Sequence, residues 1–411
     1  SGANAAAVYG ADVRTRAGSA KENRAEMSGG SVTGNVYGAA LSADSASGSV
    51  TQNIAKVSGG SIGGNVYGAS VPKTSGTADV TQNTAEISGG SIAGSVYGGQ
   101  NVGTGNADQN NVKLSGGSIA GSVYGGYAAG SGSAKDNSIT ITGGSIGHDI
   151  YGGYAAGGKT TGNTVNIGDG SHALSAGTSI VGTIYGGSQA DVKDNTLNVK
   201  TNATAGNIAG FAKIKFELNG SLNSAQPMLR LTNGAATTGL DWAGVEAAPM
   251  PSHVTVKTYE PYQLTLMHNN AGLNFVQGGK DTYAPIGAKE RIQGNLEFVI
   301  DTDSHAAQAR SVYLSGYQFQ NNTGAAYTAA DGTHSAAWGG RTAVGNTVTN
   351  NKLTVSGGSL TDAAYGGLVE NHKRNAGGPL STGDAVKNTV ILSSGANAAA
   401  VYGADVRTRA G

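Results

Sequence analysis

Residues 88–99 read SGGSIAGSVYGG, and residues 115–126 read SGGSIAGSVYGG again. Variants of this motif occupy 28–39, 58–69 and 142–153, and looser forms end in IYGG at 184–187, AYGG at 364–367 and VYGA at 401–404. The five clear copies follow one another at intervals of 27 to 30 residues. Self-similarity at this period is typical of solenoid proteins, in which each repeat forms one coil.

A second pattern precedes each motif, an asparagine followed by alternating apolar residues, as in Asn83-Thr-Ala-Glu-Ile87. Period-two alternation predicts strands and disfavours helical repeats. One coil then contains this strand, a tight Ser-Gly-Gly-Ser turn with glycines at positive φ, a second strand Ile-x-Gly-x-Val-Tyr, and a variable loop after Gly-Gly. We predict an all-β fold, a β-solenoid (parallel β-helix) with coils of about 27–30 residues.

Stacked coils place each residue over its counterpart in the next coil, about 4.8 Å away. Counting by twos from Ile92 puts Gly94 and Val96 in the core and Tyr97 outside, unless a bulge at the following Gly-Gly turns the ring inward. We favour an outward ladder of structural tyrosines: Tyr37, Tyr67, Tyr97, Tyr124, Tyr151 and Tyr185.

The asparagines of the second pattern are predicted to form another ladder, with side-chain amides hydrogen-bonded along the solenoid axis. The alternative is that each asparagine only caps its own strand through an Asx-turn. The residues concerned are Asn23, Asn53, Asn83, Asn110, Asn137, Asn163 and Asn195.

The composition favours a repetitive or fibrous protein over an ordinary enzyme. Glycine supplies 69 of 411 residues and charged residues only 13%, against average shares of about 7% and 25%. Basic and acidic residues balance at 26 each, and no basic run exceeds Lys373-Arg374, so we expect no nucleic-acid partner. Cysteine is absent and the seven histidines are scattered, so we expect no disulfide, metal or other cofactor.

No apolar stretch approaches the roughly 18 residues that span a bilayer, and the first residues lack the pattern of a signal peptide. We therefore expect no direct membrane insertion of this segment. The chain is expected to be either cytosolic or the interior of a longer precursor.

The repeats divide the chain into three stretches. Residues 1–200 carry the regular solenoid repeats, and residues 351–411 carry them again. Residues 201–350 contain all five phenylalanines and both tryptophans, and period-two segments such as Lys213-Ile-Lys-Phe-Glu-Leu218 persist there. We predict an irregular, bulkier β segment, built either from irregular coils or from an inserted β-domain, with Trp242 and Trp338 in its core.

Residues 394–411, SGANAAAVYGADVRTRAG, duplicate residues 1–18 at an offset of 393 residues. The identity includes Asp-Val-Arg-Thr-Arg, which lies outside the repeat consensus. We infer a tandem array of units of about 393 residues, with a deliberately overlapped design as the alternative. Neither terminus reads as a polar solenoid cap, so the expected partner is the chain itself, head-to-tail along a fibre or as covalent tandem repeats.

The order Asn-x-Val-x-Ile, SGGSIxGxVYGG and variable loop, over residues 20–200 and 351–411, resembles glycine-rich repeat passenger domains of autotransporter (type V secreted) adhesins of Gram-negative bacteria. The segment from Phe211 to Leu218 also looks like a stretch that follows such repeats. The resemblance implies an extracellular or cell-surface location and an adhesive or structural use, with no fixed catalytic residues.

Two patterns point to chemistry. Residues 153–160, GYAAGGKT, satisfy the phosphate-binding pattern GxxxxGK[ST], but strand-like sequence rather than a helix follows. Parallel β-helices also carry polysaccharide lyases and glycosidases, and Asp301 and Asp303 are the best carboxylate pair, with Glu290 and Glu297 nearby. Such a pair is more often a solvated strand face, so we predict no enzyme.

Loops on a rigid scaffold are the natural places for specificity. Candidate binding residues in these loops are Tyr127, Tyr154, His372, Lys373 and Arg374. The sequence thus predicts an extracellular structural or adhesive β-solenoid, one unit of a tandemly repeated surface fibre or adhesin stalk. The alternatives are an adhesin that binds host or bacterial surface glycans through its loops and, less favoured, a β-helix polysaccharide lyase or glycosidase.

Overall fold

The computed structural model describes residues 3–188, 194–219, 222–237, 239–251, 254–276, 289–303, 308–371 and 383–408. The predicted fold class is confirmed: the chain is almost entirely β-structure, mostly parallel, in a β-solenoid of about 11 turns. It separates into two compact units. Unit 1 comprises Ser1–Ala248 and Met267–Tyr283, and unit 2 comprises Pro249–Leu266 and Ala284–Gly411.

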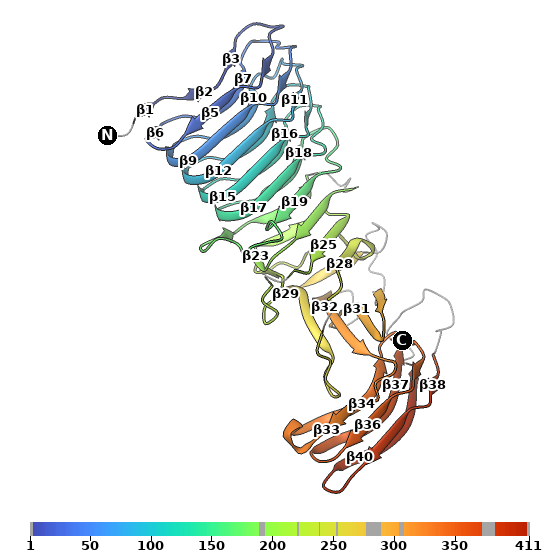
Figure 1. The fold of residues 1–411 in the computed structure, drawn as a ribbon. Helices are drawn as coiled ribbons and strands as arrows, with labels where there is room; N and C mark the ends of the chain where they lie inside the picture. The colour runs from blue at the N-terminus through green and yellow to red at the C-terminus, as the bar shows by residue number, and fades with distance from the viewer. Residues whose placement is uncertain are drawn as a thin grey trace. The chain divides into compact units, whose positions relative to one another are not determined.

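Unit 1 is built on three parallel sheets, and the first of them has twelve strands among the described residues. Its strands lie side by side as successive rungs (Figure 1). In order they are β1 (Asn4–Ala5), β6 (Ser31–Val32), β9 (Ile54–Ile62), β12 (Thr84–Ile92), β15 (Asn111–Ile119), β17 (Ser138–Ile146), β19 (Thr164–Ile167), β22 (Thr196–Val199), β25 (Lys213–Glu217) and β28 (Val245–Ala248), with β5 (Arg24–Met27) beside β9 and β20 (Ser179–Ile180) beside β17.

The second sheet takes one strand from each regular coil, and the third takes one from each of four consecutive coils. The second contains β2 (Val8–Tyr9), β7 (Val36–Leu41), β10 (Val66–Val71), β13 (Val96–Asn101), β16 (Val123–Ala128), β18 (Ile150–Ala155), β21 (Thr183–Gly187) and β24 (Asn207–Ala209), with β3 (Asp12–Val13) beside β7. The third contains β4 (Ala20–Lys21), β8 (Val50–Thr51), β11 (Val80–Thr81) and β14 (Ala107–Asp108).

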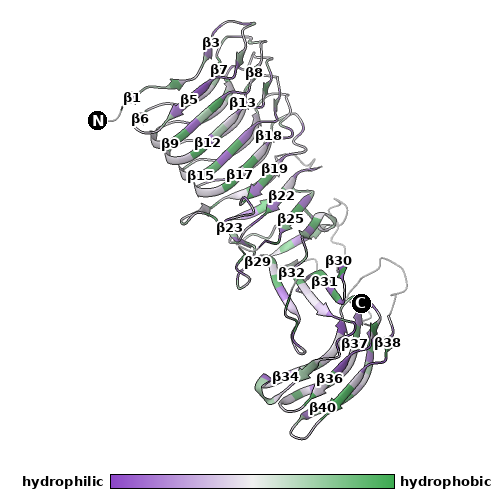
Figure 2. Ribbon diagram, viewed as in Figure 1, coloured by the Kyte–Doolittle hydropathy of each residue, from purple (hydrophilic) through white to green (hydrophobic). Residues whose placement is uncertain are grey.

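Like residues lie over like residues because the coils stack in register. Val57 pairs with Ile87 and Ile87 with Leu114, and all three side chains are at most 1% exposed. Figure 2 shows polar and apolar residues alternating along these strands, and apolar residues such as Val57 and Ile87 are buried. Burying such a side chain contributes about 1.5–3 kcal/mol each, so the regular coils are stabilised by continuous apolar columns.

The Ser-Gly-Gly-Ser segment differs from the prediction, because it is a bulge inside a strand and not a tight turn. Strand β9 runs from Ile54 to Ile62 without a break, and the pairing register shifts at this segment in neighbouring strands. Gly60 has φ of 91°, a conformation that residues with a side chain rarely adopt. The glycine therefore allows the first strand to bend and continue to Ile62.

The predicted second strand is also shorter than expected. Ala93 and Gly94 form a bend, and β13 begins only at Val96. Gly94 is half-exposed and lies at a corner of the coil, so its predicted place in the core is wrong. Ile92 and Val96 are buried on either side of this corner, in different sheets.

The solenoid of unit 1 continues past residue 200. Strands β22, β25 and β28 extend the first sheet in parallel register as far as Ala248. Three further strands also pair in parallel: β23 (Ala203–Ala205), β26 (Leu229–Leu231) and the Met267–Val276 part of β29 (Tyr262–Val276). Strand β27 (Leu240–Asp241) pairs with β29 and leads into the short helix η1 (Trp242–Gly244). In this helix, Trp242 makes a buried contact with Phe275. The predicted bulkier stretch therefore begins as irregular coils of the same solenoid.

Unit 2 combines an antiparallel segment with three stacked coils. The antiparallel strands are β30 (Lys289–Gln293), β31 (Leu296–Thr302) and β32 (Gln308–Gln318). The coils contribute β33 (Ala325–Tyr327), β36 (Lys352–Val355) and β39 (Thr389–Leu392) to one sheet, β34 (Thr333–Thr342), β37 (Ser359–Asn371) and β40 (Asn397–Thr408) to a second, and β35 (Val348–Thr349) and β38 (Ala385–Val386) to a third; the short helix η2 (Ala329–Asp331) joins β33 to β34. The return of the repeat thus begins at Ala325, earlier than residue 351.

Candidate functional site: the asparagine and tyrosine columns

The seven predicted asparagines form one hydrogen-bonded column along unit 1. In Asn53, both the backbone N–H and the side-chain Nδ2 donate to Oδ1 of Asn83, each at 2.9 Å. Nδ2 of Asn53 also donates to the carbonyl oxygens of Ala20 and Thr51, both at 3.0 Å. The same pattern of N–H and Nδ2 donation to the next asparagine runs from Asn23 to Asn195.

These bonds decide between the two interpretations of the asparagines. An Asx-turn would use the side-chain oxygen within its own coil, whereas Oδ1 of Asn83 accepts from the neighbouring coil. From Asn53 to Asn195 the column members are at most 1% exposed, and Asn23 is half-buried. Buried amides with satisfied donors and acceptors make the column a structural element that links coil to coil.

The residue before each asparagine has a left-handed backbone conformation. The sequence patterns did not predict this conformation. Gln52 and Gln82 have φ of 60° and 62°, and Gly162 holds the same position with φ of 73°. The left-handed conformation turns the chain sharply from the third sheet into the first. The signal in the sequence was weak, because the position is occupied by Glu22, Gln52, Gln82, Gln109, Asp136, Gly162 and Asp194.

Unit 2 contains a shorter asparagine column of the same kind. The backbone N–H of Asn322 donates to Oδ1 of Asn351 at 2.9 Å, and the N–H and Nδ2 of Asn351 donate to Oδ1 of Asn388 at 3.1 and 2.9 Å. Asn321, Asn350 and Lys387 precede these three residues with φ of 54°, 56° and 55°. Both units therefore have the same asparagine corner, in which a left-handed residue is followed by an asparagine of the column.

The six predicted tyrosines stack face to face, and Tyr9 extends their column by one ring. Centroid separations between successive rings are 4.7–5.1 Å, and interplanar angles are 4–13°. Five of the six predicted rings lie outside the core as predicted, that of Tyr67 is buried, and none of the six is freely exposed. Tyr67 is only 6% exposed, Tyr9 is 45% exposed, and the other five are half-buried. Offset stacks of this kind stabilise by about 0.5–1.5 kcal/mol per pair beyond area burial.

The alternation of burial breaks after the tyrosine and places a later residue on the same face. Along β13, Tyr97 and Gln100 are half-buried, and the two glycines between them are buried. A Cβ on Gly99 would lie 2.5 Å from Cγ of Asn110, so this glycine allows the backbone to pack directly against the asparagine column. The second glycine of the motif thus connects the two columns.

Tyr127 and Tyr154 occupy the position of Gln100 and are not loop residues, which corrects the prediction. They lie in β16 and β18, are half-buried, and stack on each other at 4.8 Å. Tyr127 meets Tyr124 edge to face at 5.2 Å, and Tyr154 meets Tyr151 in the same way at 5.6 Å. The other predicted binding residues, His372, Lys373 and Arg374, lie outside the described residues.

Burial raises the pKa of five phenols in the tyrosine column, those of Tyr37, Tyr67, Tyr97, Tyr124 and Tyr151. Burial, reinforced by the neighbouring Tyr37, raises the pKa of Tyr67 to about 12, although Asn65 donates a hydrogen bond to its phenol oxygen at 2.8 Å. Burial also raises the pKa of Tyr97 and Tyr151, with further contributions from Tyr67 and Asp149, respectively. These five phenols are therefore uncharged at neutral pH, which permits close stacking.

In unit 2 the ring column begins with a tryptophan. Trp338 pairs in register with Tyr365, and Tyr365 pairs with Tyr402. Trp338 is buried, as predicted, and the guanidinium carbon of Arg341 lies 4.5 Å from its ring centre. The sequence Ala-Trp-Gly-Gly at 337–340 is therefore the repeat motif with tryptophan in place of tyrosine.

The residues singled out for chemistry have structural contacts. Residues 153–160 connect β18 to a loop, and the next regular element is strand β19. Asp303 Oδ1 accepts from the backbone N–H groups of Arg310 and Ser311, and Oδ1 of Asp301 accepts from the N–H of Thr302. Glu297 is fully buried and accepts from Thr342 Oγ1 at 2.6 Å. Glu290 belongs to β30, and its side chain lies outside the described residues.

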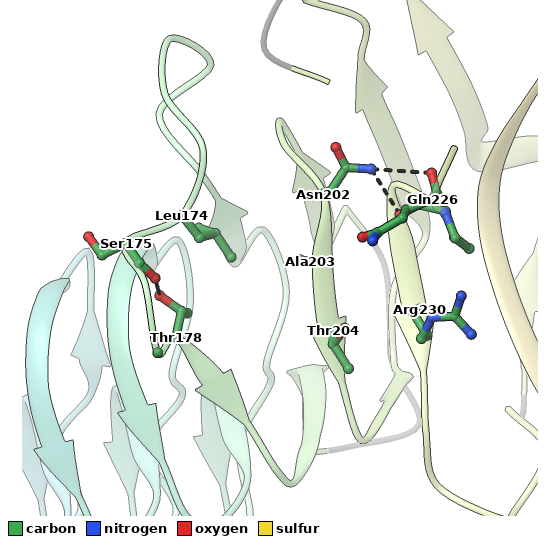
Figure 3. A pocket seen from close by; sticks show the side chains of 10 residues that line it. Leu174, Ser175, Thr178, Asn202, Ala203, Thr204, Gln226 and Arg230 are labelled. Atoms are coloured by element: carbon green, nitrogen blue, oxygen red, sulfur yellow. Dashed lines mark hydrogen bonds between the residues drawn. The ribbon is translucent and has the colours of Figure 1, made fainter. Parts of the chain in front are cut away.

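A shallow cavity of about 200 Å³ lies on unit 1 beside β23 and β26. Figure 3 shows Leu174, Ser175 and Thr178 on one side, and Asn202, Gln226 and Arg230 on the other. Asn202 Nδ2 donates to the carbonyl oxygens of Gln226 and Pro227, so this amide stabilises that side of the cavity. The lining is polar and includes one cation, which suits a hydroxyl-rich or anionic ligand.

Within the described ranges, no cluster of three or more His, Asp or Glu residues is arranged to hold a metal ion. In the same part of the chain, no helix is long and apolar enough to cross a membrane. Comparison of the chain with protein families, curated proteins and solved structures finds no match.

Proposed function

We propose that this chain is an extracellular structural β-solenoid, one unit of a tandemly repeated surface fibre or adhesin stalk. The proposal rests on one observation: the repeated asparagines and tyrosines make their contacts between neighbouring coils. They are the most regular polar and aromatic groups of the chain. In Asn83, Nδ2 donates to Val50, Thr81 and Asn110, and Oδ1 accepts from Asn53. Such columns resist bending and separation of coils, which is the property a shaft needs.

Electron microscopy of the purified intact protein tests the structural part of this proposal. Rods of uniform width, with an axial repeat corresponding to about 4.8 Å for each coil, are the expected result. Isolated globular particles at all concentrations would reject a role as a fibre unit. Antibody labelling of intact producing cells tests the location, and labelling that appears only after permeabilisation would contradict an extracellular role.

A second candidate function is binding of an acidic saccharide on the face that carries the cavity. Thr204, Arg230 and His268 occupy successive rungs in register, so a hydroxyl, a guanidinium and an imidazole line one row. Guanidinium groups bind carboxylates in a bidentate manner, which favours a uronic-acid chain over a neutral glycan.

Calorimetric titration with oligogalacturonate and with a neutral oligosaccharide of equal length tests this candidate. Saturable binding of the acidic ligand, lost in Arg230→Ala and kept in Arg291→Ala, is the expected result. Arg291 is a matched control because it is another exposed arginine, on strand β30 of unit 2. Equal binding by both variants would reject the site.

A further inference from the structure

The two identical segments, residues 1–18 and 394–411, pair with neighbouring coils through opposite edges. In the first copy, Val8 and Tyr9 pair with Val36 and Tyr37, which follow them in the chain. In the second copy, Val401 and Tyr402 pair with residues that precede them. Each described copy forms the outermost strand of its sheet. One sequence thus has two demonstrated neighbours, one for each of its edges.

The pairing has the same two features on both sides: the tyrosines lie opposite each other, and the register shifts by one residue between the asparagine and the valine. Tyr9 stacks on Tyr37 at 4.7 Å, and Tyr402, which is its counterpart, stacks on Tyr365 at 5.4 Å. Asn4 pairs with Ser31, and its counterpart Asn397 pairs with Ser359. A coil of this sequence can therefore lie between residues 359–371 and residues 31–41 with the pairing that each edge already shows.

The polar contacts at the two edges use different atoms. In the second copy, Nε of Arg407 donates to Oδ2 of Asp405 at 2.7 Å, and Nη2 of Arg407 contacts the phenol oxygen of Tyr365 in the preceding coil. In the first copy, the Ser42 hydroxyl of the following coil contacts Oδ1 of Asp12, the counterpart of Asp405. Both sets of contacts can thus be made at once by one Asp-Arg pair.

Apolar side chains are exposed on the last coil of unit 2. Val401, Tyr402 and Val406 are 46%, 42% and 47% exposed, and Leu392 on β39 is 48% exposed. Interior valines at the motif position, such as Val66, are fully buried because another coil covers them. The counterpart of Val401 in the first copy is Val8, which pairs with Val36 of the following coil.

We infer that the 18-residue segment is a single coil shared by successive units, and that the coil Ala20–Leu41 of a second copy covers the exposed edge of β40. This inference rests on the proposed function, because it describes how units of the shaft are joined. The asparagine column continues in phase across the joint. With the 393-residue offset, Asn23 of the next unit falls 28 residues after Asn388, within the intervals of 26 to 37 residues that separate bonded members of the column.

A chain of two units tests the shared coil, with residue 411 followed by residue 19 of a second copy. The probe is a cysteine placed by Val401→Cys in the first copy, since the natural chain has none. In the one-unit chain this cysteine should react rapidly with a thiol reagent. In the two-unit chain the reaction should slow by about 100-fold or more, because it then requires local opening. Val181→Cys is the control, 62% exposed and remote from the joint, and should react equally in both chains.

A disulfide measurement covers the case in which the Val401→Cys chain folds poorly. Tyr402→Cys in the first copy should form a disulfide with Tyr37→Cys in the second, because directly opposed residues lie within disulfide reach. The matched pair Tyr402→Cys and Tyr67→Cys, one coil further along, should not. Unchanged reactivity at position 401, or no preference for position 37, would overturn the shared coil. Rods of the one-unit chain in the microscope would still support the proposed function.

Discussion

The regular coils of unit 1 and the three coils of unit 2 share their corner and differ in their ring column. In both units an asparagine donates through N–H and Nδ2 to the next asparagine, after a residue at φ near 60°. Unit 1 stacks tyrosine on tyrosine, whereas unit 2 places Trp338, Tyr365 and Tyr402 in register and adds Arg341 and Arg407 over the rings. The corner is thus the fixed part of the coil, and the ring position accepts substitutes.

The difference has a physical cause. A buried asparagine carries a donor and an acceptor on one short side chain, and it uses both to satisfy backbone groups. A half-buried ring needs only a flat neighbour about 4.8 Å away. The comparison therefore predicts that damage to the corner is equally severe in both units, and that damage to the ring column is milder and differs between them.

Removal of a corner asparagine should have the largest effect. In Asn83→Ala, the backbone N–H of Asn53 loses its partner, and the carbonyl oxygens of Val50 and Thr81 each lose one donor. Each unsatisfied buried group costs about 1–3 kcal/mol, so we expect unit 1 to lose about 3–5 kcal/mol. Asn351→Ala should destabilise unit 2 to a similar extent.

Hydrogen exchange followed by mass spectrometry measures each unit separately, which a single melting curve would not. Thr84→Ala is the control, since Thr84 lies next to the column and its side chain is half-buried. A loss below about 1 kcal/mol in either asparagine variant would show that the column is not the common element.

Changes in the ring column should rank second. Tyr97→Leu removes stacking against both Tyr67 and Tyr124, and we expect a loss of about 1–3 kcal/mol in urea unfolding. Trp338→Tyr should be nearly neutral in unit 2, because Tyr365 already holds the next rung and Nε1 of Trp338 is buried without a hydrogen-bond partner. If the tryptophan variant were the more damaging of the two, the ring positions of the two units would not be equivalent.

Alkaline pH should weaken unit 1 through its tyrosines. Burial raises the pKa of Tyr67 to about 12 in the folded state, while an unfolded tyrosine has a pKa near 10. The stabilisation is therefore complete below pH 10 and is lost as the pH rises toward 12, by about 1 kcal/mol at pH 11. Unfolding midpoints measured from pH 8 to 11.5 check this, and a constant midpoint in wild type would contradict it. Tyr67→Phe should reduce the decline.

The smallest effect should be a gain in stability at the left-handed corner. Gln52 and Lys387 are exposed and have φ of 60° and 55°. Gln52→Gly and Lys387→Gly relieve this strain, and after the entropic cost of glycine we expect a net gain of about 0.5–1 kcal/mol in each unit. Gly162 already occupies the equivalent position. Destabilisation by either substitution, measured by hydrogen exchange, would show that the two corners differ.

Periodicity predicted the fold well because every coil repeats the same apolar alternation. The spacing of Asn83, Ile87, Ile92 and Tyr97 is sufficient to place one strand pair and both columns. The turns were harder, because Ser-Gly-Gly-Ser is compatible with a tight turn and with a bulge, and the observed bulge depends on pairing with adjacent coils. Gly94 was misplaced for a related reason: counting by twos does not detect a corner within the motif.

The site could be predicted only where the repeat was exact. Trp338 escaped notice as a member of the ring column because its residue type differs, and Asn322 did so because β33 begins three residues later instead of one. The left-handed residues escaped because Glu, Gln, Asp and Gly have different side chains, and polar residues also occur at many other positions of the coil. These positions are defined by the backbone of the stack, which single-sequence patterns do not report.

The spacing between bonded asparagines varies from 26 to 37 residues, although the columns stay in register. From Asn53 to Asn163 the two long strands of every coil keep nine and six residues. The variation there falls in the connecting loops, where each doubling of length costs only about 0.6 kcal/mol of closure entropy. The solenoid can thus gain or lose loop residues by insertion and deletion while its frame is retained. For protein engineering, each coil offers an insertion point, and consecutive points are spaced at the pitch of the stack.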